Sequence, residues 1–477
     1  MNRAKLLIKN FFAYGFAEFI SKIVPFLCLP LVTRLMPDTA AFGVFNMYTV
    51  VSGISVTLIV LNMHTAVFRD YFLSKPEDTN YDITTTGQRI VLFNSLIICL
   101  ILIVFNQFFS RLFFNDVQYS LVIVFSAIAI FFTANNYLIE LPTRLQNQRR
   151  IFIISKLISS VGYYAVILFL IYIGFTYYSI IFGAIFTAIF LMAYFWIKNK
   201  DFFLEGKFDR DIAKSLYKTG VPLMPASIMY WLYSGISVIL ISRFLDLNEL
   251  GVYSFGSKIA RISQILATVL IGGLTHFIYS TLKDKDYKTM IGKLWEIMFV
   301  FSTIFYLVLF LLKDFIFNTF FTGDYLQGIV VFPYLLLVPL LSFLKFFFLT
   351  QFTIIGKPIY HFVIYFIDCA LLFALSLLLL PDYGIVGVAI ANVCSSYVSL
   401  TILIVLAVIK KKLIVFQAST YFLFLLFLFV FIFINSKDTI FLNQIMIFGY
   451  MAVAFLMNIK RIYNYFGVRS SEFGVRS

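Results

Sequence analysis

Two basic residues stand three positions apart inside a long apolar segment of this chain. They are Lys258 and Arg261. Residues three apart share one face of a helix, and like charges placed in this way repel each other. We therefore expect the pair to bind an anion, for which arginine offers two parallel N–H donors. Ion pairs with Glu18 or Asp368, or a position near a wetted helix end, are the alternatives.

Four more charged residues belong to the first two apolar segments. Glu18 and Lys22 are four apart, so they can pair on one face of a helix. Either they neutralise each other, or Lys22 faces a cavity and binds substrate while Glu18 tunes it or carries a proton. Arg69 and Asp70 end the second segment, where they form either an interfacial pair or part of a cavity mouth that contacts substrate.

Lys345 and Asp368 each lie well inside an apolar segment of their own. A charge at mid-membrane costs roughly 2.5–3.5 kcal/mol on insertion scales, so such residues usually face a cavity or pair with each other. We expect Lys345 to contact substrate and Asp368 to carry a coupling proton or sodium ion. An ion pair between the two is the equal alternative. Lys156 lies near a segment end and can extend its side chain to the interface.

Several tyrosines in or beside apolar segments could stack on sugar rings. They are Tyr14, Tyr48, Tyr230, Tyr233 and Tyr253. Tyrosine is also enriched at both faces of a membrane and packs between helices. A sugar-binding role and a structural role therefore both stay open for these residues.

The sequence carries none of the short motifs that mark common catalytic sites. H-E-x-x-H, G-x-x-x-x-G-K-[ST] and G-x-S-x-G are all missing from it. The cysteines, which are Cys28, Cys99, Cys369 and Cys394, lie singly in apolar segments and form no C-x-x-C pair. We therefore expect no enzyme activity, no use of a nucleotide, no cofactor and no metal site.

The composition identifies the solvent in which these residues must be positioned. Of 477 residues, 61% are hydrophobic and 13% are charged, whereas a soluble domain is about half apolar and about a quarter charged. Most of the chain must therefore face lipid. The net charge of +14 could indicate nucleic-acid binding, but the basic residues lie in short loops between apolar segments, so we expect no nucleic-acid partner.

The apolar segments predict about fourteen transmembrane helices, since each needs about 20 mostly apolar residues. The first has no small-residue cleavage site, so we interpret it as a helix and not as a signal peptide. The predicted spans are 10–33, 42–65, 89–109, 119–140, 151–173, 177–197, 219–242, 252–277, 294–312, 329–353, 359–380, 384–409, 414–434 and 440–458.

The distribution of lysine and arginine predicts the orientation of these spans. With both termini in the cytoplasm, 27 of these residues fall in cytoplasmic segments and 5 in outer loops. Cytoplasmic loops of membrane proteins carry such an excess. The outer loops are all short, and none is long enough to form a catalytic domain.

The chain contains an internal repeat at an offset of about 208 residues. Thr33-Arg34-Leu35 precedes Gly43-Val44-Phe45 in the first copy, and Ser242-Arg243-Phe244 precedes Gly251-Val252-Tyr253 in the second. Six spans per copy give both copies the same orientation, as in some secondary transporters. We predict an N-terminal lobe over 1–197, a cytoplasmic linker over 198–218, a C-terminal lobe over 219–412 and two further helices over 413–460. The tail 461–477 repeats FGVRS, which is compatible with a cloning or reading-frame artefact.

Several short motifs, in this order and spacing, resemble the polysaccharide transporter family, the Wzx-type O-antigen flippases of the multidrug/oligosaccharidyl-lipid/polysaccharide exporter superfamily. The resemblance covers nearly the whole chain. The motifs are TRLMP at 33–37 with FG at 42–43, GVPLMP at 220–225 with Trp231, GVYS at 251–254, KIA at 258–260 and DYGIVGVA at 382–389. In one departure, Ser237 and Val238 occupy the positions at which many members carry an Asp-Arg pair.

The resemblance implies a flippase in the bacterial inner membrane. Its substrate would be a polyprenyl-diphosphate-linked O-antigen or polysaccharide repeat unit, moved to the periplasmic leaflet by alternating access, with an ion gradient driving or resetting the cycle. A polymerase and a chain-length regulator of the same pathway would be its partners. The alternatives are a multidrug or cation antiporter of the same superfamily and a membrane-embedded polysaccharide polymerase.

Overall fold

All regular secondary structure among the described residues is helical. The computed structural model describes residues 21, 23–36, 38–73, 79–146, 148–280, 286–355, 357, 359–410, 414, 418–436, 444–451 and 453–454. Its helices are α2 (Thr39–Val60), α3 (Met63–Leu73), α4 (Thr79–Val104), α5 (Asn106–Phe114), η1 (Val117–Tyr119), α6 (Ser120–Ile139), α7 (Leu141–Leu145), α8 (Arg149–Leu157), η2 (Ile158–Gly162), α9 (Tyr163–Tyr172), α10 (Tyr178–Leu204), α11 (Arg210–Gly220), η3 (Val221–Leu223), α12 (Met224–Phe244), α13 (Leu247–Ala260), α14 (Ile262–Ser280), α15 (Tyr287–Leu311), α16 (Lys313–Phe320), η4 (Gly323–Val330), α17 (Phe332–Ile354), α18 (Ile359–Ile404), η5 (Val405–Lys410) and α19 (Ala418–Ser436).

Nine helical segments of the described part are long and apolar enough to cross a membrane. They are Thr39–Val60, Asn80–Val104, Val117–Leu145, Arg150–Tyr172, Tyr178–Leu204, Ser227–Phe244, Tyr287–Leu311, Phe332–Ile354 and Ile359–Ala407. The predicted class, an all-α multi-pass membrane protein, is therefore confirmed. The count of fourteen spans stays a prediction, because parts of the first, thirteenth and fourteenth spans lie outside the described residues.

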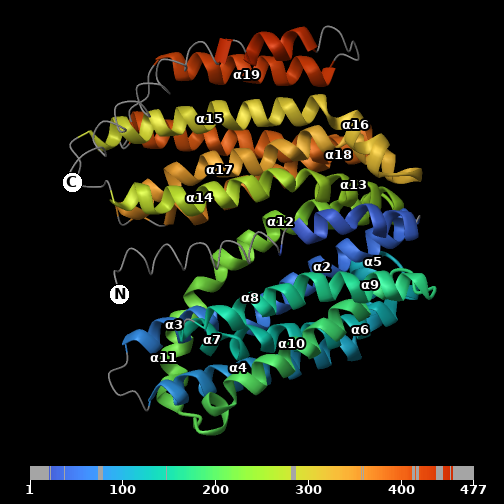
Figure 1. The fold of residues 1–477 in the computed structure, drawn as a ribbon, viewed down its shortest axis with the longest axis vertical. Coiled ribbons are helices and arrows are strands. Elements are labelled where there is room, and N and C mark those ends of the chain that lie inside the picture. Colours follow the sequence, from blue (N-terminus) through green and yellow to red (C-terminus); the bar gives the residue numbers. More distant parts are fainter. Residues whose placement is uncertain are drawn as a thin grey trace, which may run out of the picture. The chain divides into compact units, whose positions relative to one another are not determined.

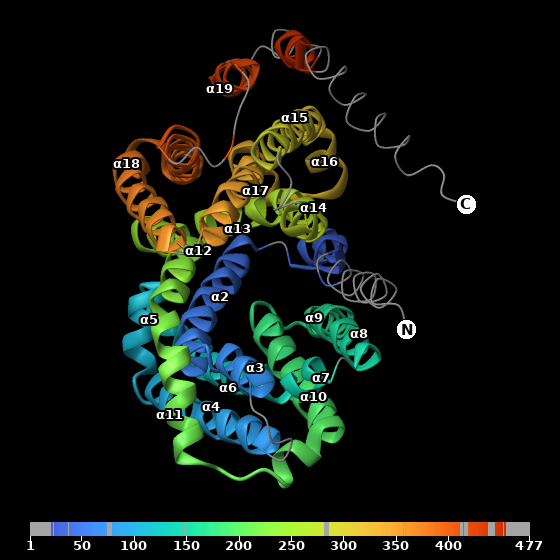
Figure 2. The same ribbon diagram turned by 90° about the vertical axis from the view of Figure 1, so that its left-hand side faces the viewer.

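The chain divides into two compact units. Unit 1 comprises Met1–Ile259, Phe320–Gly328 and Tyr365–Ala391, and unit 2 comprises Ala260–Thr319, Ile329–Ile364 and Asn392–Ser477. In unit 1, helices α4 and α10 both pack against α6 (Figures 1 and 2). In unit 2, α14 and α15 both pack against α17.

Buried amides tie the first helices of unit 1 together. Gln88 Nε2 on α4 donates to Asn135 Oδ1 on α6 at 2.8 Å, and Asn135 Nδ2 donates to Ser95 Oγ at 3.0 Å. On α10, Asn199 Nδ2 donates to the Ile139 carbonyl oxygen at 2.8 Å. Buried polar groups need such partners because an unmade hydrogen bond in an apolar interior is costly. These bonds fix the register of neighbouring helices.

The helix predicted over 42–65 is shorter than expected. Leu61 and Asn62 both adopt left-handed backbone angles, with φ of 48° and 56°, so α2 stops at Val60 and α3 starts afresh at Met63. Gly220 lies so close at this corner that a Cβ there would come within 2.5 Å of the Leu61 carbonyl oxygen. The close approach explains why a residue without a side chain occupies position 220.

The helix predicted over 252–277 is interrupted. It forms α13 up to Ala260 and α14 from Ile262, with Arg261 in the turn between them. The Arg261 carbonyl oxygen accepts from the amides of Gln264 and Ile265, which begins the new helix. The expectation of one continuous helix through Lys258 and Arg261 is therefore wrong, while a shared face for their side chains stays a prediction.

A reversal of the chain lies within α18. Gly384 has φ 54° and ψ −136°, which are not helical angles. A Cβ on Gly387 would come within 2.5 Å of the carbonyl oxygen of Leu379, eight residues earlier. Eight residues of continuous helix would rise about 12 Å. The segment is thus two helices joined by a tight turn, as the separate predictions over 359–380 and 384–409 require.

Candidate functional site

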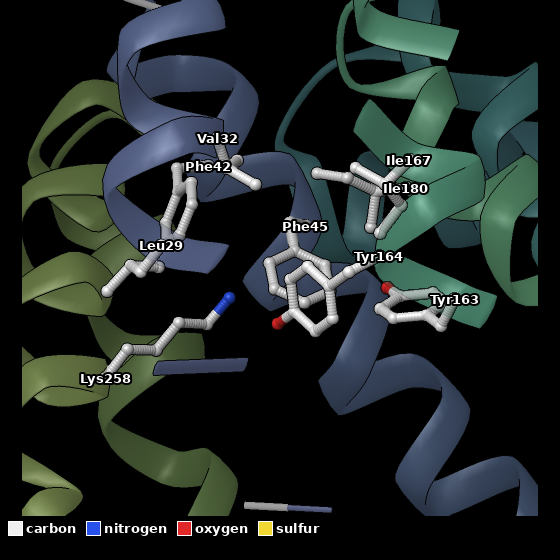
Figure 3. Close-up of a pocket in the computed structure, with 9 residues that line it drawn as sticks. All are labelled: Leu29, Val32, Phe42, Phe45, Tyr163, Tyr164, Ile167, Ile180 and Lys258. Carbon is white, nitrogen blue, oxygen red and sulfur yellow. The ribbon is translucent and has the colours of Figure 1, made fainter. Parts of the chain in front are cut away.

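The side chain of Lys258 lines a small, open pocket in unit 1, whose empty volume of about 270 Å³ includes open solvent. The pocket walls come from three parts of the sequence that are far apart, 29–45, 163–180 and position 258 (Figure 3). The lining residues are Leu29, Val32, Phe42, Phe45, Tyr163, Tyr164, Ile167, Ile180 and Lys258. One cation therefore shares a largely aromatic and aliphatic cavity with two phenol hydroxyl groups.

Two aromatic faces seat the Lys258 ammonium group. Its Nζ lies 3.3 Å from the ring centroid of Phe45 and 4.1 Å from that of Phe42. Ammonium groups are attracted to the negative face of an aromatic ring, more strongly where water is excluded. The rings therefore stabilise a positive charge in the wall of the cavity, where an anion that enters would meet it.

An irregular turn places Tyr163 and Tyr164 in the opposite wall. They follow the π-helical segment η2, Ile158–Gly162, and begin α9. Consecutive residues on an α-helix point about 100° apart, yet both tyrosines line the same pocket. In Figure 3 the Tyr164 hydroxyl lies on the Lys258 side of the cavity. π-Helical turns occur often at functional sites.

Phe42 also belongs to a second group of rings, which we call the four-ring cluster: Phe42, Phe255, Phe321 and Tyr325. Ring centroids of Phe42 lie 5.9 Å from Phe255 and 5.8 Å from Tyr325. Phe255 in turn lies 4.7 Å from Phe321 and 4.9 Å from Tyr325. All four rings are buried. The predicted orientation puts this cluster near the outer ends of α2 and α13.

Tyr325 fastens the segment Phe320–Gly328 to the start of α2. Its hydroxyl oxygen lies 2.8 Å from the carbonyl oxygen of Met36 and 3.0 Å from that of Asp38, and it donates its hydrogen to this pair. Burial raises the pKa of the Tyr325 phenol well above its usual range, and the nearby Asp38 carboxylate raises it further. The phenol therefore stays protonated and can donate this bond.

Helices α2 and α13 approach each other closely beside this cluster. A Cβ on Gly43 would overlap the Leu247 carbonyl oxygen, and a Cβ on Gly251 would overlap the Thr39 carbonyl oxygen. A hydrogen bond from Asn46 Nδ2 to Ser254 Oγ, 2.6 Å long, joins the same two helices. Asn46 and Ser254 are equivalent positions of the two repeats. The contact of Gly43 with Leu247 is likewise equivalent to the contact of Gly251 with Thr39, at the same offset of 208 residues. Close packing of this kind requires residues with little or no side chain.

Of the described basic residues predicted at the site, Arg69, Arg261 and Lys345 do not line this pocket. Arg69 is exposed on α3, and its Nη1 donates to Thr219 Oγ1 at 2.5 Å. Ser215 Oγ donates to Asp70 Oδ2 at 2.8 Å, so both members of the predicted pair contact α11. Arg261 is exposed in the turn that follows α13. Glu18 and Lys22 lie outside the described residues.

Lys345 and Asp368 are both buried. Lys345 in unit 2 is 3% exposed, and its Nζ donates to Ser399 Oγ at 3.1 Å. Asp368 in unit 1 is 0% exposed. A charged group without access to water is costly unless it is compensated. The ion pair considered between these two residues stays an untested alternative.

The predicted tyrosines fall into two groups. Tyr48 and Tyr253 are buried, whereas Tyr230 on α12 is 57% exposed, with its ring centroid 6.1 Å from that of Tyr365. Tyr233 contacts Tyr365 as well, at 6.2 Å. Tyr14 lies outside the described residues.

Sequence reasoning missed the aromatic partners of Lys258. Phe42, Phe45, Tyr163 and Tyr164 were not among the expected binding residues, because aromatic residues are abundant in every apolar segment of this chain. The one local signal was the pair Tyr163-Tyr164 directly after Ser-Ser-Val-Gly at 159–162. Small residues are common in membrane helices where chains approach closely, so this signal alone was weak.

Comparison with known proteins gives one family and one fold. A family model described as "Polysaccharide biosynthesis protein" matches residues 31–329. No curated protein matches the chain.

Several solved structures share the fold. One, described as "Lipid II flippase MurJ, inward closed conformation", has a TM-score of 0.68 and 15% identity, and the match covers 95% of this chain and 99% of that one. A second, an inward-facing multidrug resistance MATE family transporter of the MOP superfamily, has a TM-score of 0.62 and 12% identity, over 84% of this chain and 95% of that one. The Vibrio cholerae MATE transporter VcmN in its bent form has a TM-score of 0.55 and 14% identity, over 87% of this chain and 98% of that one. The chain therefore shares the fold of these proteins.

Proposed function

Because the chain belongs to the family described as "Polysaccharide biosynthesis protein", we propose that it is a flippase for polyprenyl-diphosphate-linked O-antigen or polysaccharide repeat units in a bacterial inner membrane. The family match and the shared fold confirm the resemblance of the sequence to the polysaccharide transporter family. The observation that carries the proposal is the position of Lys258, a cation of a predicted span that lines a pocket together with Tyr163 and Tyr164.

The proposed chemistry at the pocket is recognition of a diphosphate. The Lys258 ammonium group would exchange its aromatic neighbours for phosphate oxygens, which accept charge-assisted hydrogen bonds. Arg261, three residues on in the sequence, is the second cation proposed to contact the same head group. Tyr163 and Tyr164 would present hydroxyl groups and ring faces to the sugar nearest the diphosphate.

The proposed cycle is alternating access. The polar head group would enter from the cytoplasmic side, while the polyprenyl chain stays in lipid. Reorientation of the two repeats would then expose the head group to the periplasm. Arg69 would contact the substrate at the cytoplasmic mouth and Lys345 and Lys22 further along its path. Glu18 and Asp368 are the candidates for a coupling proton or sodium ion, since carboxylates within membrane spans commonly serve such relays.

The test removes the cations and measures transport. In a strain that lacks its own flippase gene, Lys258→Ala/Arg261→Ala should abolish complementation, seen as loss of surface polysaccharide at matched protein levels. Lys156→Ala is the matched control, because Lys156 is another lysine within a predicted span, with its Nζ 5.2 Å from the centroid of the Phe152 ring. Normal surface polysaccharide in the double variant would show that the proposed binding site is wrong.

The antiporter alternative is supported by the MATE structures that share the fold. Purified protein in liposomes separates the two functions. A flippase should move a fluorescent polyprenyl-diphosphate-linked glycan between leaflets and leave an organic cation such as ethidium where it is. The opposite result would favour the antiporter. A polymerase would instead lengthen the glycan, which gel analysis of the recovered lipid would show.

A further inference from the structure

The Phe42 ring belongs both to the Lys258 pocket and to the four-ring cluster. One set of contacts puts it 4.1 Å from Lys258 Nζ. The other puts it edge-on to Phe255 and Tyr325, at 5.9 and 5.8 Å with interplanar angles of 78° in both cases. Its side chain is only 1% exposed, so the ring cannot shift without displacing neighbours. A single side chain thus connects a cation to a packed helix junction.

The neighbouring ring Phe45 does not have this double position. It seats the ammonium group more closely, at 3.3 Å, and contacts Phe42 at 5.8 Å. Among the described ring contacts, none joins Phe45 to Phe255, Phe321 or Tyr325. Figure 3 shows Phe42 and Phe45 on different sides of the Lys258 ammonium group. The two phenylalanines of α2 therefore provide an internal comparison.

The four-ring cluster closes the junction of α2 and α13 together with the Tyr325 hydrogen bond and the contact between Asn46 and Ser254. Those helices would have to part for the proposed substrate to leave on the outer side. Edge-to-face ring contacts favour particular ring orientations. A change in the position of Phe42 would therefore weaken this junction.

We propose that Phe42 is a positioning residue that couples occupancy of the Lys258 pocket to release of the junction between α2 and α13. This inference rests on the proposed function. A diphosphate that draws Lys258 away removes a cation from the Phe42 ring face, which changes the ring orientation that is most stable and so the packing of its neighbours in the four-ring cluster. Coupling of this kind requires that the ligand change the relative stability of two arrangements of the junction.

The experiment measures the junction directly by disulfide cross-linking. Asn46→Cys/Ser254→Cys is placed in a background in which Cys28, Cys99, Cys369 and Cys394 are replaced by serine, and the protein is held in lipid nanodiscs. Polyprenyl diphosphate without a glycan is the probe. It should slow disulfide formation by about fivefold or more, the lower range of typical coupling between sites. Gln88→Cys/Asn135→Cys, across α4 and α6, is the control pair and should not respond.

The Phe42 and Phe45 variants then test the route. Each variant is compared at a probe concentration that saturates its own binding, since both rings line the pocket. Phe42→Leu should then respond to the probe less than about twofold, whereas Phe45→Leu should respond about fivefold or more. Phe42→Tyr retains the ring face and should restore the response. Thermal melting and probe binding are measured for each variant, so that a loss of fold is recognised by the failure of both.

The outcomes separate this inference from the proposed function. If the probe binds the unsubstituted protein but leaves cross-linking unchanged, or if Phe42→Leu responds fully, the coupling is wrong and the function stands. The same holds if Phe45→Leu, rather than Phe42→Leu, loses the response. If the probe does not bind in a manner that depends on Lys258, the proposed function is wrong, and the coupling falls with it.

Discussion

Helices α2 and α13 start in the same way, but α13 carries Glu249 in its first turn and Lys258 in its last, whereas α2 carries no charged residue. Each begins after an aspartate whose side chain accepts a backbone amide, Asp38 from Ala40 and Asp246 from Glu249. Each then carries a glycine, Gly43 or Gly251, that lies against the other helix. Further along, the likeness ends at the site: position 258 is a lysine, and its equivalent at the 208-residue offset is Val50.

The difference separates two kinds of position. At the helix junction, equivalent positions of the two copies need the same property, either a capping side chain or no side chain at all. The reason is that each helix lies against the backbone of the other at equivalent positions. Val50 and Lys258 face different surroundings: the Val50 carbonyl oxygen accepts from Trp231 Nε1 at 3.1 Å, while Lys258 lines the pocket. Packing therefore preserves the likeness of the copies, and the proposed function depends on where they differ.

The largest expected effect comes from filling the junction. Gly43→Ala and Gly251→Ala should each destabilise the protein by about 3 kcal/mol or more, since overpacking against a backbone atom cannot be relieved by a side-chain rotation. Thermal melting and the yield of folded protein in detergent measure this. Gly235→Ala is the control, because a Cβ there meets Val50 at an ordinary 3.5 Å. A stable Gly43→Ala protein beside an unstable Gly251→Ala protein would break the equivalence of the two helices.

The next largest effect is expected when Lys258 in the second repeat is replaced by valine, the residue at the equivalent position 50 of the first repeat. Lys258→Val should reduce flipping of the labelled lipid-linked glycan by about tenfold or more, equal to about 1.4 kcal/mol of lost interaction, while the melting temperature stays the same or rises. Lys258→Arg should retain much of the transport, because it keeps the charge. Full transport by Lys258→Val would show that the difference between the copies has no functional role.

A smaller effect is expected at the bond that holds the segment Phe320–Gly328. Tyr325→Phe keeps the ring in the four-ring cluster and removes only the hydroxyl group. Loss of one hydrogen bond should cost about 1 kcal/mol and slow disulfide formation between Asn46→Cys and Ser254→Cys without any probe. An unchanged cross-linking rate would mean that the rings alone hold the junction.

The smallest effect is expected from exchanging the polar residues across the junction. Asn46→Ser/Ser254→Asn keeps one amide and one hydroxyl group, so its stability should lie within about 0.5 kcal/mol of the original, whereas Asn46→Ala should lose about 1 kcal/mol. Thermal melting is measured for the original protein, for Asn46→Ser alone, for Ser254→Asn alone, for Asn46→Ala and for the exchanged protein. A marked loss in the exchanged protein would show that the surroundings of the two positions are not equivalent.

The membrane class and most of the spans were predictable because hydrophobicity is a local property. A run of about 20 apolar residues has few alternatives to a transmembrane helix, and the described spans at 150–172 and 332–354 lie within three residues of the predicted ones. The offset of 208 residues was readable for a similar reason, since capped starts and junction glycines recur in order. Lys258 attracted attention because a charge is rare within such a segment.

The sequence by itself determined an all-helical membrane protein with a repeated pattern and a small set of embedded charges. Only the tertiary structure decided which side chains surround each of those charges. It interrupts the helix at Arg261 and places the Lys258 ammonium group against the rings of Phe42 and Phe45. It also brings Tyr325 to Met36, 289 positions away along the chain. Such contacts depend on how whole helices pack, and with 60 phenylalanines in the chain no local pattern could select the few rings that meet.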